Sequence, residues 1–283
     1  MYVNMVDRPA DLVRLSLHGD RGERVASFPQ LSTPDVIALL PDGRTVVPAN
    51  AGGRARLMAV ETGKDAVPLI ATAEETAAPL TSVGLREIAF VIGPSPRETI
   101  ALAQIANGRI TRRIAPGKGV INSLASSPDG QELYFAAGNS VWAISSSGGE
   151  ARMICSGDSV TADPSGRGLV ISRVETSRMR LYRVTLDGKS EQEVSVDDSV
   201  PLFPQVLSPN ALRSDGRLLA PLAPRDSWFG PAGVVDTATG RITRIPSDNT
   251  SDYHSMAWLP DGQVVALKIG LRATIWKFNR EPR

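Results

Sequence analysis

Short apolar runs alternate with turn-forming residues along the whole of this chain. Ile88–Ile92 and Val264–Leu267 are apolar at every position, without the alternation expected of a strand that faces water on one side. Strands that are covered on both faces have this composition, because neither face meets solvent. No stretch of the sequence has the periodicity of an amphipathic helix. The pattern predicts an all-β protein in which sheets pack face to face.

A turn with the sequence Pro-Asp-Gly, or a close variant of it, recurs between the apolar runs. Its glycines lie at positions 43, 84, 130, 166, 216 and 262, so the repeat is 36 to 50 residues long. One clear unit has its strands at Ile121–Ala125, Glu132–Ala136, Ser140–Ile144 and Ala151–Ile154. A repeat of this length, built from four short strands, is typical of a β-propeller blade. We expect each turn glycine to have a positive φ, which glycine adopts without steric cost.

The predicted fold is therefore a β-propeller of six or seven four-stranded blades. The repeats run over residues 1–28, 36–70, 80–114, 121–154, 159–194, 205–245 and 254–279. The first and last units have three strands each, which brings the total to 26 strands, and this count favours seven blades with the incomplete units meeting at the closure. We expect residues 1–283 to form a single propeller domain. The incomplete first unit suggests a fragment of a longer multidomain protein.

The charge balance narrows the range of partners. Lys and Arg number 31 and Asp and Glu number 30, a net charge of +1, so no field of one sign favours nucleic acid. No apolar run is long enough to span a membrane, and the charged first thirty residues do not form a signal peptide. The single cysteine, Cys155, excludes an intrachain disulfide. The compartment stays open: cytoplasmic for the chain as it stands, or extracytoplasmic for the sensor of an anchored parent protein.

Three stretches of the chain resemble a known family. Ser127–Phe135, with the sequence Ser-Pro-Asp-Gly-Gln-Glu-Leu-Tyr-Phe, and the following Trp142 resemble the PD40 (WD40-like) repeats of TolB-like propellers. Arg225–Phe229 and Ile275–Phe278 look like the C-terminal sensor propeller of bacterial regulators that also carry a kinase or winged-helix domain. The resemblance implies a non-catalytic module that recognises a protein or peptide partner, or a small ligand. No Trp-Asp dipeptide occurs, so these are not true WD40 repeats.

Motifs of catalysis and of metal binding are missing from the sequence. It contains no Gly-x-Ser-x-Gly, His-Glu-x-x-His or Cys-x-x-Cys motif and only two histidines, His18 and His254. The prediction is a non-enzyme that needs no metal or cofactor. The alternative is a propeller enzyme or enzyme accessory, such as a lyase-type propeller or the gating propeller of a prolyl oligopeptidase-like hydrolase.

A long connection supplies the candidate binding residues. Residues 221–231 join the second and third strands of one unit, and in a propeller such loops lie on the same face as the starts of the innermost strands. We expect a binding surface formed by Arg225, Asp226, Trp228, Phe229, Tyr253 and His254. The competing interpretations are that Trp228 is a plug buried against the neighbouring blade, and that His254 has a structural role.

Overall fold

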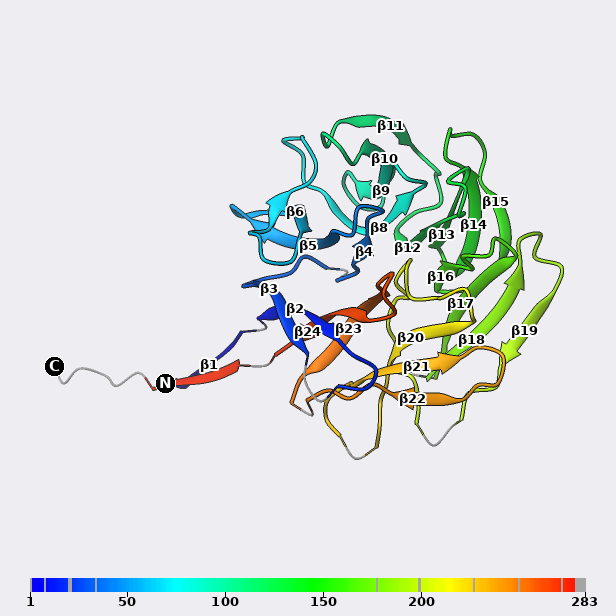
Figure 1. The fold of residues 1–283 in the computed structure, drawn as a ribbon. Helices are drawn as coiled ribbons and strands as arrows, with labels where there is room; N and C mark the ends of the chain where they lie inside the picture. Colours follow the sequence, from blue (N-terminus) through cyan, green and yellow to red (C-terminus); the bar gives the residue numbers. More distant parts are fainter. Residues whose placement is uncertain are drawn as a thin grey trace.

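In a computed structural model, six sheets surround a common axis as the blades of a propeller (Figure 1). The structure describes the chain except residues 1, 8, 20–21, 34, 177, 198–199, 226, 249, 271 and 278–283, and describes only the backbone of residues 2–7 and 272–277. All the regular elements of the described residues are strands. These residues include no helix of the length and apolar character needed to cross a membrane. The predicted all-β propeller is confirmed.

We number the blades in chain order, from the innermost strand of each outward. Blade I contains β4 (Ala38–Leu39), β5 (Thr45–Ala51), β6 (Arg54–Val60) and β7 (Val67–Pro68). Blade II contains β8 (Ala77–Val83), β9 (Glu87–Ile92), β10 (Thr99–Gln104) and β11 (Ile110–Ile114). Blade III contains β12 (Ile121–Ser126), β13 (Glu132–Ala137), β14 (Ser140–Ser145) and β15 (Arg152–Ser156). Neighbouring strands within each blade are antiparallel.

The next two blades differ in their innermost strand. Blade IV contains β16 (Ser159–Ala162), β17 (Gly168–Glu175), β18 (Arg178–Thr185) and β19 (Glu191–Val194). Blade V contains β20 (Arg217–Pro221), β21 (Ala232–Asp236) and β22 (Ile242–Arg244). Its innermost position is occupied by residues 206–212, which meet β20 through the isolated bridge Leu212↔Leu218. Pro209 lies in this segment and has no N–H to donate, which interrupts a regular ladder.

Blade VI is built from both ends of the chain. Its order is β23 (Asp252–Trp258), β24 (Val264–Ile269), β2 (Ala10–Leu15) and β3 (Glu23–Phe28). β2 pairs with β24, placing Leu12 opposite Leu267, so the N-terminal strands close the ring on the C-terminal ones. β1 (Tyr2–Asp7) and β25 (Arg272–Lys277) pair with each other as a two-stranded ribbon outside the blades (Figure 1).

The number of blades is six, the lower of the two predicted values. The preference for seven was wrong because it assigned residues 1–28 and 254–279 to separate blades, whereas two strands from each combine in blade VI. β1 and β25 had been counted as blade strands, but their hydrogen bonds are to each other. A repeat count cannot distinguish two incomplete blades from one shared blade, because the difference lies in pairing between distant segments.

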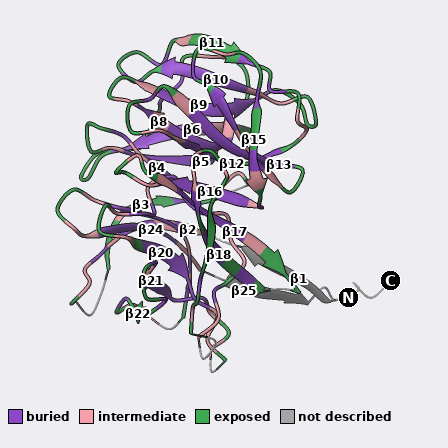
Figure 2. Ribbon diagram, turned by 90° about the vertical axis from the view of Figure 1, so that its right-hand side faces the viewer, coloured by how far each residue is buried: buried purple, intermediate pink, exposed green. Residues whose placement is uncertain are grey.

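The core lies between the blades. On β9, Ile88 and Phe90 pack toward blade I, while Ala89 and Val91 pack toward blade III, which explains why this strand is apolar throughout. Figure 2 shows the inner strands buried and the outermost β11 largely exposed. The expected face-to-face burial of the apolar strands is therefore observed.

Buried serines connect the innermost strands around part of the ring. The backbone N–H of Val160 donates to Oγ of Ser123 (3.0 Å), and that of Leu207 donates to Ser159 (3.2 Å). The series continues as Met256 to Ser208 (3.1 Å) and Ile37 to Ser255 (2.8 Å). Each serine thus satisfies an inner-strand N–H of the following blade, from blade III to blade I. Buried N–H groups without a partner are costly, so this series stabilises the stacking of blades.

The turn glycines have the backbone predicted for them. φ is positive at all six, with values of 88°, 54°, 72°, 73°, 83° and 81° for Gly43, Gly84, Gly130, Gly166, Gly216 and Gly262. Gly130 has a second constraint, because a Cβ there would lie 2.8 Å from the backbone nitrogen of Gly84 in blade II. The turn of blade III therefore packs directly on the turn of blade II.

Candidate functional site

The two faces of the ring differ in the connections that they carry. The turn face carries the Pro-Asp-Gly turns and the hairpins between third and fourth strands. The opposite face, here called the mouth face, carries residues 221–231 and the segments that enter β4, β8, β12, β16 and β23. Successive strands of a blade run in opposite directions, so these two sets of connections are separated. The predicted binding residues belong to the mouth face.

Trp228 is fully exposed, with a relative accessibility of 100%. The loop that carries it is nonetheless attached to blade VI: the N–H of Gly230 donates to Oδ1 of Asp252 (2.7 Å), and the N–H of Tyr253 donates to the carbonyl of Gly230 (2.8 Å). The interpretation of Trp228 as a buried plug is therefore wrong. An indole held in solvent by an anchored loop is an unusual use of a large apolar side chain.

The neighbours of Trp228 have mixed exposure. Arg225 is exposed, and Phe229 is half-buried, with its N–H donating to Oγ of Ser227 (3.0 Å). Asp226, also predicted to bind, lies outside the described residues. The described part of the loop thus presents a cation and two aromatic side chains of decreasing exposure.

Tyr253 does not share this surface. Its side chain is 2% exposed and packs in the core between blades V and VI, and its hydroxyl donates to Oδ2 of Asp248 (3.3 Å). Burial, together with the charge of Asp248, raises the pKa of Tyr253 to about 12. The placement of Tyr253 on a binding surface was wrong because adjacent residues of a strand point to opposite sides.

His254 takes the opposite direction and forms a polar cluster that the sequence did not predict. Its Nδ1 lies 2.5 Å from Oδ2 of Asp35, which belongs to the segment entering blade I. Nε2 of Gln205 donates to the other carboxylate oxygen of Asp35 (3.3 Å). The ring of Phe203 stacks on the imidazole at a centroid distance of 6.4 Å. Two connections, the segment that enters blade I and the one between β19 and β20, therefore meet at His254 on β23.

The contact with His254 changes the pKa of the Asp35 carboxyl. Burial by itself would raise the pKa of Asp35, but the hydrogen bond and the charge of His254 outweigh burial and lower the pKa. A carboxylate hydrogen-bonded to Nδ1 orients the imidazole and leaves Nε2 as the nitrogen that faces other groups. The pair is equally suited to hold two connections together and to orient a ligand-binding histidine.

A cavity of about 840 Å³ opens toward the axis of the ring, and neither His254 nor Asp35 is among its lining residues. Its lining comes from five blades, and only the axis is common to five blades. Its lining includes Thr33, two residues before Asp35, and Val206, which directly follows Gln205. Carboxylates of Glu98 and Asp158 also line it; they accept hydrogen bonds from the N–H groups of Ile121 (2.7 Å) and Val174 (2.7 Å).

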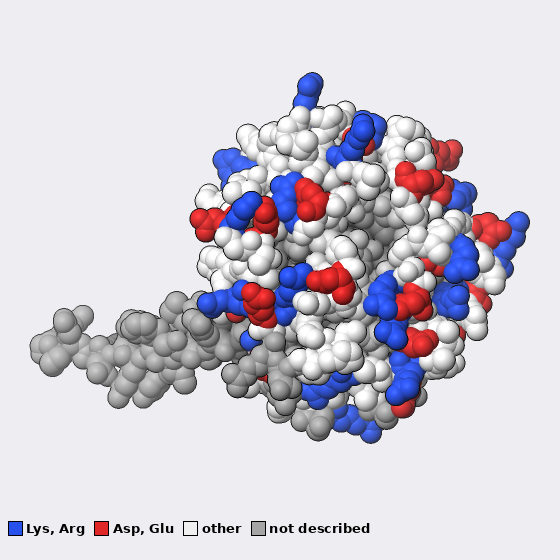
Figure 3. Space-filling model, viewed as in Figure 1, with Lys and Arg blue, Asp and Glu red and all other residues white. Residues whose placement is uncertain are grey.

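Two arginines near the mouth face, Arg56 and Arg173, have hydrogen-bond or ion-pair partners within the protein. Arg56 donates to the carbonyls of Thr72 (2.8 Å) and Glu74 (2.7 Å), and Arg173 forms an ion pair with Glu191 (2.6 Å). Basic and acidic side chains are also interspersed over the face drawn in Figure 3. Within the described residues, no three His, Cys, Asp or Glu side chains converge in a way that could hold a metal ion.

Comparison with solved structures identifies the fold. The chain is similar to a protein assigned as TolB from Agrobacterium tumefaciens, with a TM-score of 0.67 and 14% identity over 94% of this chain and 99% of that one. It is also similar to TolB from Acinetobacter baumannii, with a TM-score of 0.53 and 15% identity over 95% of this chain and 66% of that one. Hydrazine synthase from Kuenenia stuttgartiensis matches with a TM-score of 0.57 and 17% identity over 85% and 74% of the two chains.

Sequence comparison adds no family assignment. No protein-family model matches the chain, and no curated protein matches its sequence. The structural matches confirm the TolB-like propeller fold that the PD40-like turns implied. At identities below 20% this likeness concerns the fold, because one propeller fold serves many unrelated functions.

Proposed function

We propose that this propeller is a non-catalytic recognition module that binds a protein or peptide partner on its mouth face. The fully exposed indole of Trp228 is the observation that carries the proposal. Folding does not require that side chain to be aromatic, because it packs on nothing in the described chain. Trp and Arg are the residue types most enriched at binding hot spots, and Arg225 is exposed on the same loop.

Three further residues complete the proposed surface. Phe229 is half-buried next to Gly230, and Phe203 is 40% exposed. His254 contacts both the ring of Phe203 and the carboxylate of Asp35. Apolar groups surrounded by hydrogen-bonding groups give a partner both contact area and orientation. Within this class, the resemblance of Arg225–Phe229 to kinase-linked propellers favours the sensor part of a bacterial signalling regulator, with residues 1–283 as its propeller domain.

The test compares Trp228→Ala with Leu85→Ala in selection from a phage-displayed random peptide library. Leu85 is 83% exposed and lies in the turn between β8 and β9 on the turn face, so its truncation removes a similar apolar group elsewhere. We expect the wild type and Leu85→Ala to enrich a common peptide motif. Trp228→Ala should bind those peptides at least about thirtyfold more weakly, the equivalent of a hot spot of about 2 kcal/mol, with an unchanged melting temperature. Equal binding by all three proteins would reject this surface.

The His254–Asp35 pair favours a second candidate, a propeller enzyme. A carboxylate-oriented imidazole has the arrangement of a general base. The structural match to hydrazine synthase shows that this fold also occurs in an enzyme. Turnover of any substrate that is abolished by His254→Ala and retained by Trp228→Ala would favour the enzyme over the recognition module.

A further inference from the structure

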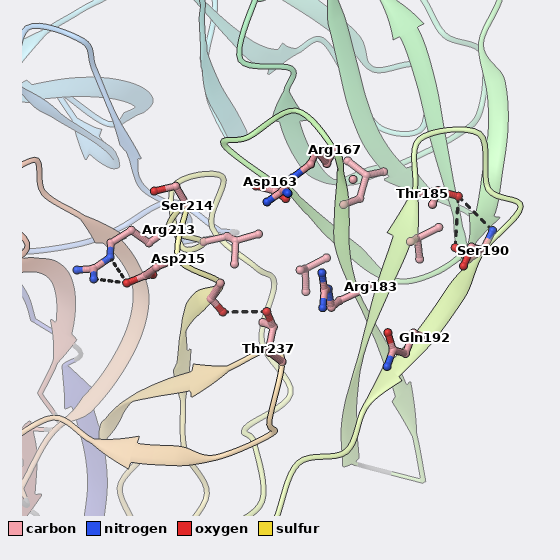
Figure 4. A pocket seen from close by; sticks show the side chains of 17 residues that line it. Asp163, Arg167, Arg183, Thr185, Ser190, Gln192, Arg213, Ser214, Asp215 and Thr237 are labelled. Carbon is pink, nitrogen blue, oxygen red and sulfur yellow. Dashed lines mark hydrogen bonds and ion pairs between the residues drawn. The ribbon is translucent and has the colours of Figure 1, made fainter.

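A groove of about 420 Å³ lies between blades IV and V on the turn face, away from the proposed partner surface (Figure 4). Its walls include the apolar side chains of Val170 and Leu212, which belong to the core between the two blades. Polar groups from both blades surround them, among them Arg183 and Gln192 from blade IV and Thr237 from blade V (Figure 4). Apolar walls with a few convergent polar groups are typical of small-molecule sites.

Arg183 occupies a position that is aliphatic in other blades. It lies two residues before Thr185, whose carbonyl accepts the N–H of Gly188 in the β18–β19 hairpin. In blades II, III and V, the residue two positions before the equivalent hairpin carbonyl is Leu102, Ala143 or Val234. These side chains are 0%, 2% and 8% exposed. Leu102 and Ala143 pack against the next blade, and Val234 belongs to the core that blades IV, V and VI share.

Strand pairing sets the face of the sheet from which the exposed side chain of Arg183 projects. It is directly opposite Val170 on β17, so the two side chains share a face, and Val170 belongs to the core between blades IV and V. On β19, Gln192 is the cross-strand partner of Arg183 and lines the same groove. A guanidinium therefore replaces an aliphatic group at the edge of an interblade contact, and the groove is the space in front of it.

The lining of the groove contains three arginines, at 167, 183 and 213, and two carboxylates, at 163 and 215, so it has an excess of one positive charge. Among the described residues, Arg183 has neither a carboxylate within ion-pair distance nor a hydrogen-bond partner for its side chain. Arg167, the next arginine of the groove, only donates from Nε to Oγ of Ser165 (2.9 Å). By contrast, Arg213 pairs with Asp215. The remaining carboxylate, Asp163, accepts the N–H of Ser165 (2.8 Å) within its own turn.

We propose that the groove between blades IV and V binds the oxyanion of a small molecule, a carboxylate or a phosphate, through the guanidinium groups of Arg183 and Arg167. The planar fork of an arginine matches two oxygens of either anion and makes charge-assisted hydrogen bonds with them. The apolar wall of Val170 and Leu212 excludes water on one side and strengthens the attraction. Gln192 supplies a neutral donor beside Arg183. This site does not depend on the partner surface of the mouth face.

The test is isothermal titration calorimetry at low ionic strength with two probes, inorganic phosphate and glutarate. The variants are Arg183→Leu, Arg183→Gln and the control Arg109→Gln. Arg109 is an exposed arginine of the β10–β11 hairpin in blade II, and within the described chain no carboxylate pairs with it. Arg183→Leu restores the kind of side chain that the other blades have, so the variant should fold with an undiminished melting temperature.

We expect the wild type and Arg109→Gln to bind at least one probe with the same affinity. Both Arg183 variants should bind that probe at least about tenfold more weakly. Preference for phosphate or for glutarate then identifies the anion. Binding that is unaffected in Arg183→Leu, weakened equally in Arg109→Gln, or absent for both probes in the wild type would overturn the proposal.

Discussion

Ser255 is the point at which closure of the ring can be tested. Its Oγ accepts the N–H of Ile37 in blade I (2.8 Å) and lies 2.5 Å from Oγ of Ser208 in blade V. Ser255 is 2% exposed and Ile37 is 0% exposed, so water cannot replace the lost hydroxyl. Ser255→Ala therefore leaves a buried N–H without a partner at the contact between blades VI and I.

The cost follows from these contacts. A buried donor left unsatisfied costs about 1–3 kcal/mol, and the lost hydroxyl pair with Ser208 adds about 0.5–1.5 kcal/mol, so we expect a loss of about 1.5–4.5 kcal/mol in the free energy of unfolding. For a chain of this size, that corresponds to a decrease of about 3–8 °C in the melting temperature. Urea denaturation followed by tryptophan fluorescence measures the loss, provided that the slope of the transition is unchanged.

Two further variants complete the experiment. Ser145→Ala removes an exposed hydroxyl at the end of β14 and should change stability by less than about 0.5 kcal/mol. Ser123→Ala removes the equivalent buried acceptor between blades III and IV, away from the closure, and should cost about as much as Ser255→Ala. A Ser255→Ala protein as stable as Ser145→Ala would refute the idea that the serine series holds the blades together.

Two other predictions concern local features. Gly130→Val should lower the free energy of unfolding by about 1–3 kcal/mol, because φ is 72° there and a Cβ would lie 2.8 Å from the nitrogen of Gly84; an unchanged urea midpoint would contradict this. The pKa of Asp35 is lowered from its ordinary 3.8, because the contact with His254 outweighs the effect of burial. The ionised carboxylate therefore stabilises the fold above pH 3.8, and this contribution is lost as the pH falls through the lowered pKa. The stability of Asp35→Asn should therefore decrease less than that of the wild type as the pH falls below 3.8, and parallel pH profiles would contradict the assignment.

The candidate site was only partly predictable. The 221–231 loop and the exposure of Trp228 agree with the expectation of a recognition surface, although binding itself stays a prediction. No sequence pattern pointed to Asp35 or Phe203 as site residues, because each is a single residue in an irregular connection. His254 lies 219 residues from Asp35 in the chain, and one sequence does not report such a contact. The groove around Arg183 could not be predicted from the sequence either, because its other wall comes from blade V.

Local chemistry determined the strands and turns. The positive φ of Gly130 and the burial of Ile88–Ile92 follow from residue type and immediate neighbours, so the sequence by itself predicted a propeller of short strands. Tertiary structure decided the six-blade count, because β2 joins β24 through pairs such as Leu12↔Leu267 that no local pattern encodes. It also decided that Tyr253 is buried while Trp228 is exposed. Burial is a property of what lies opposite a side chain, and in a closed ring the opposite surface comes from another part of the chain.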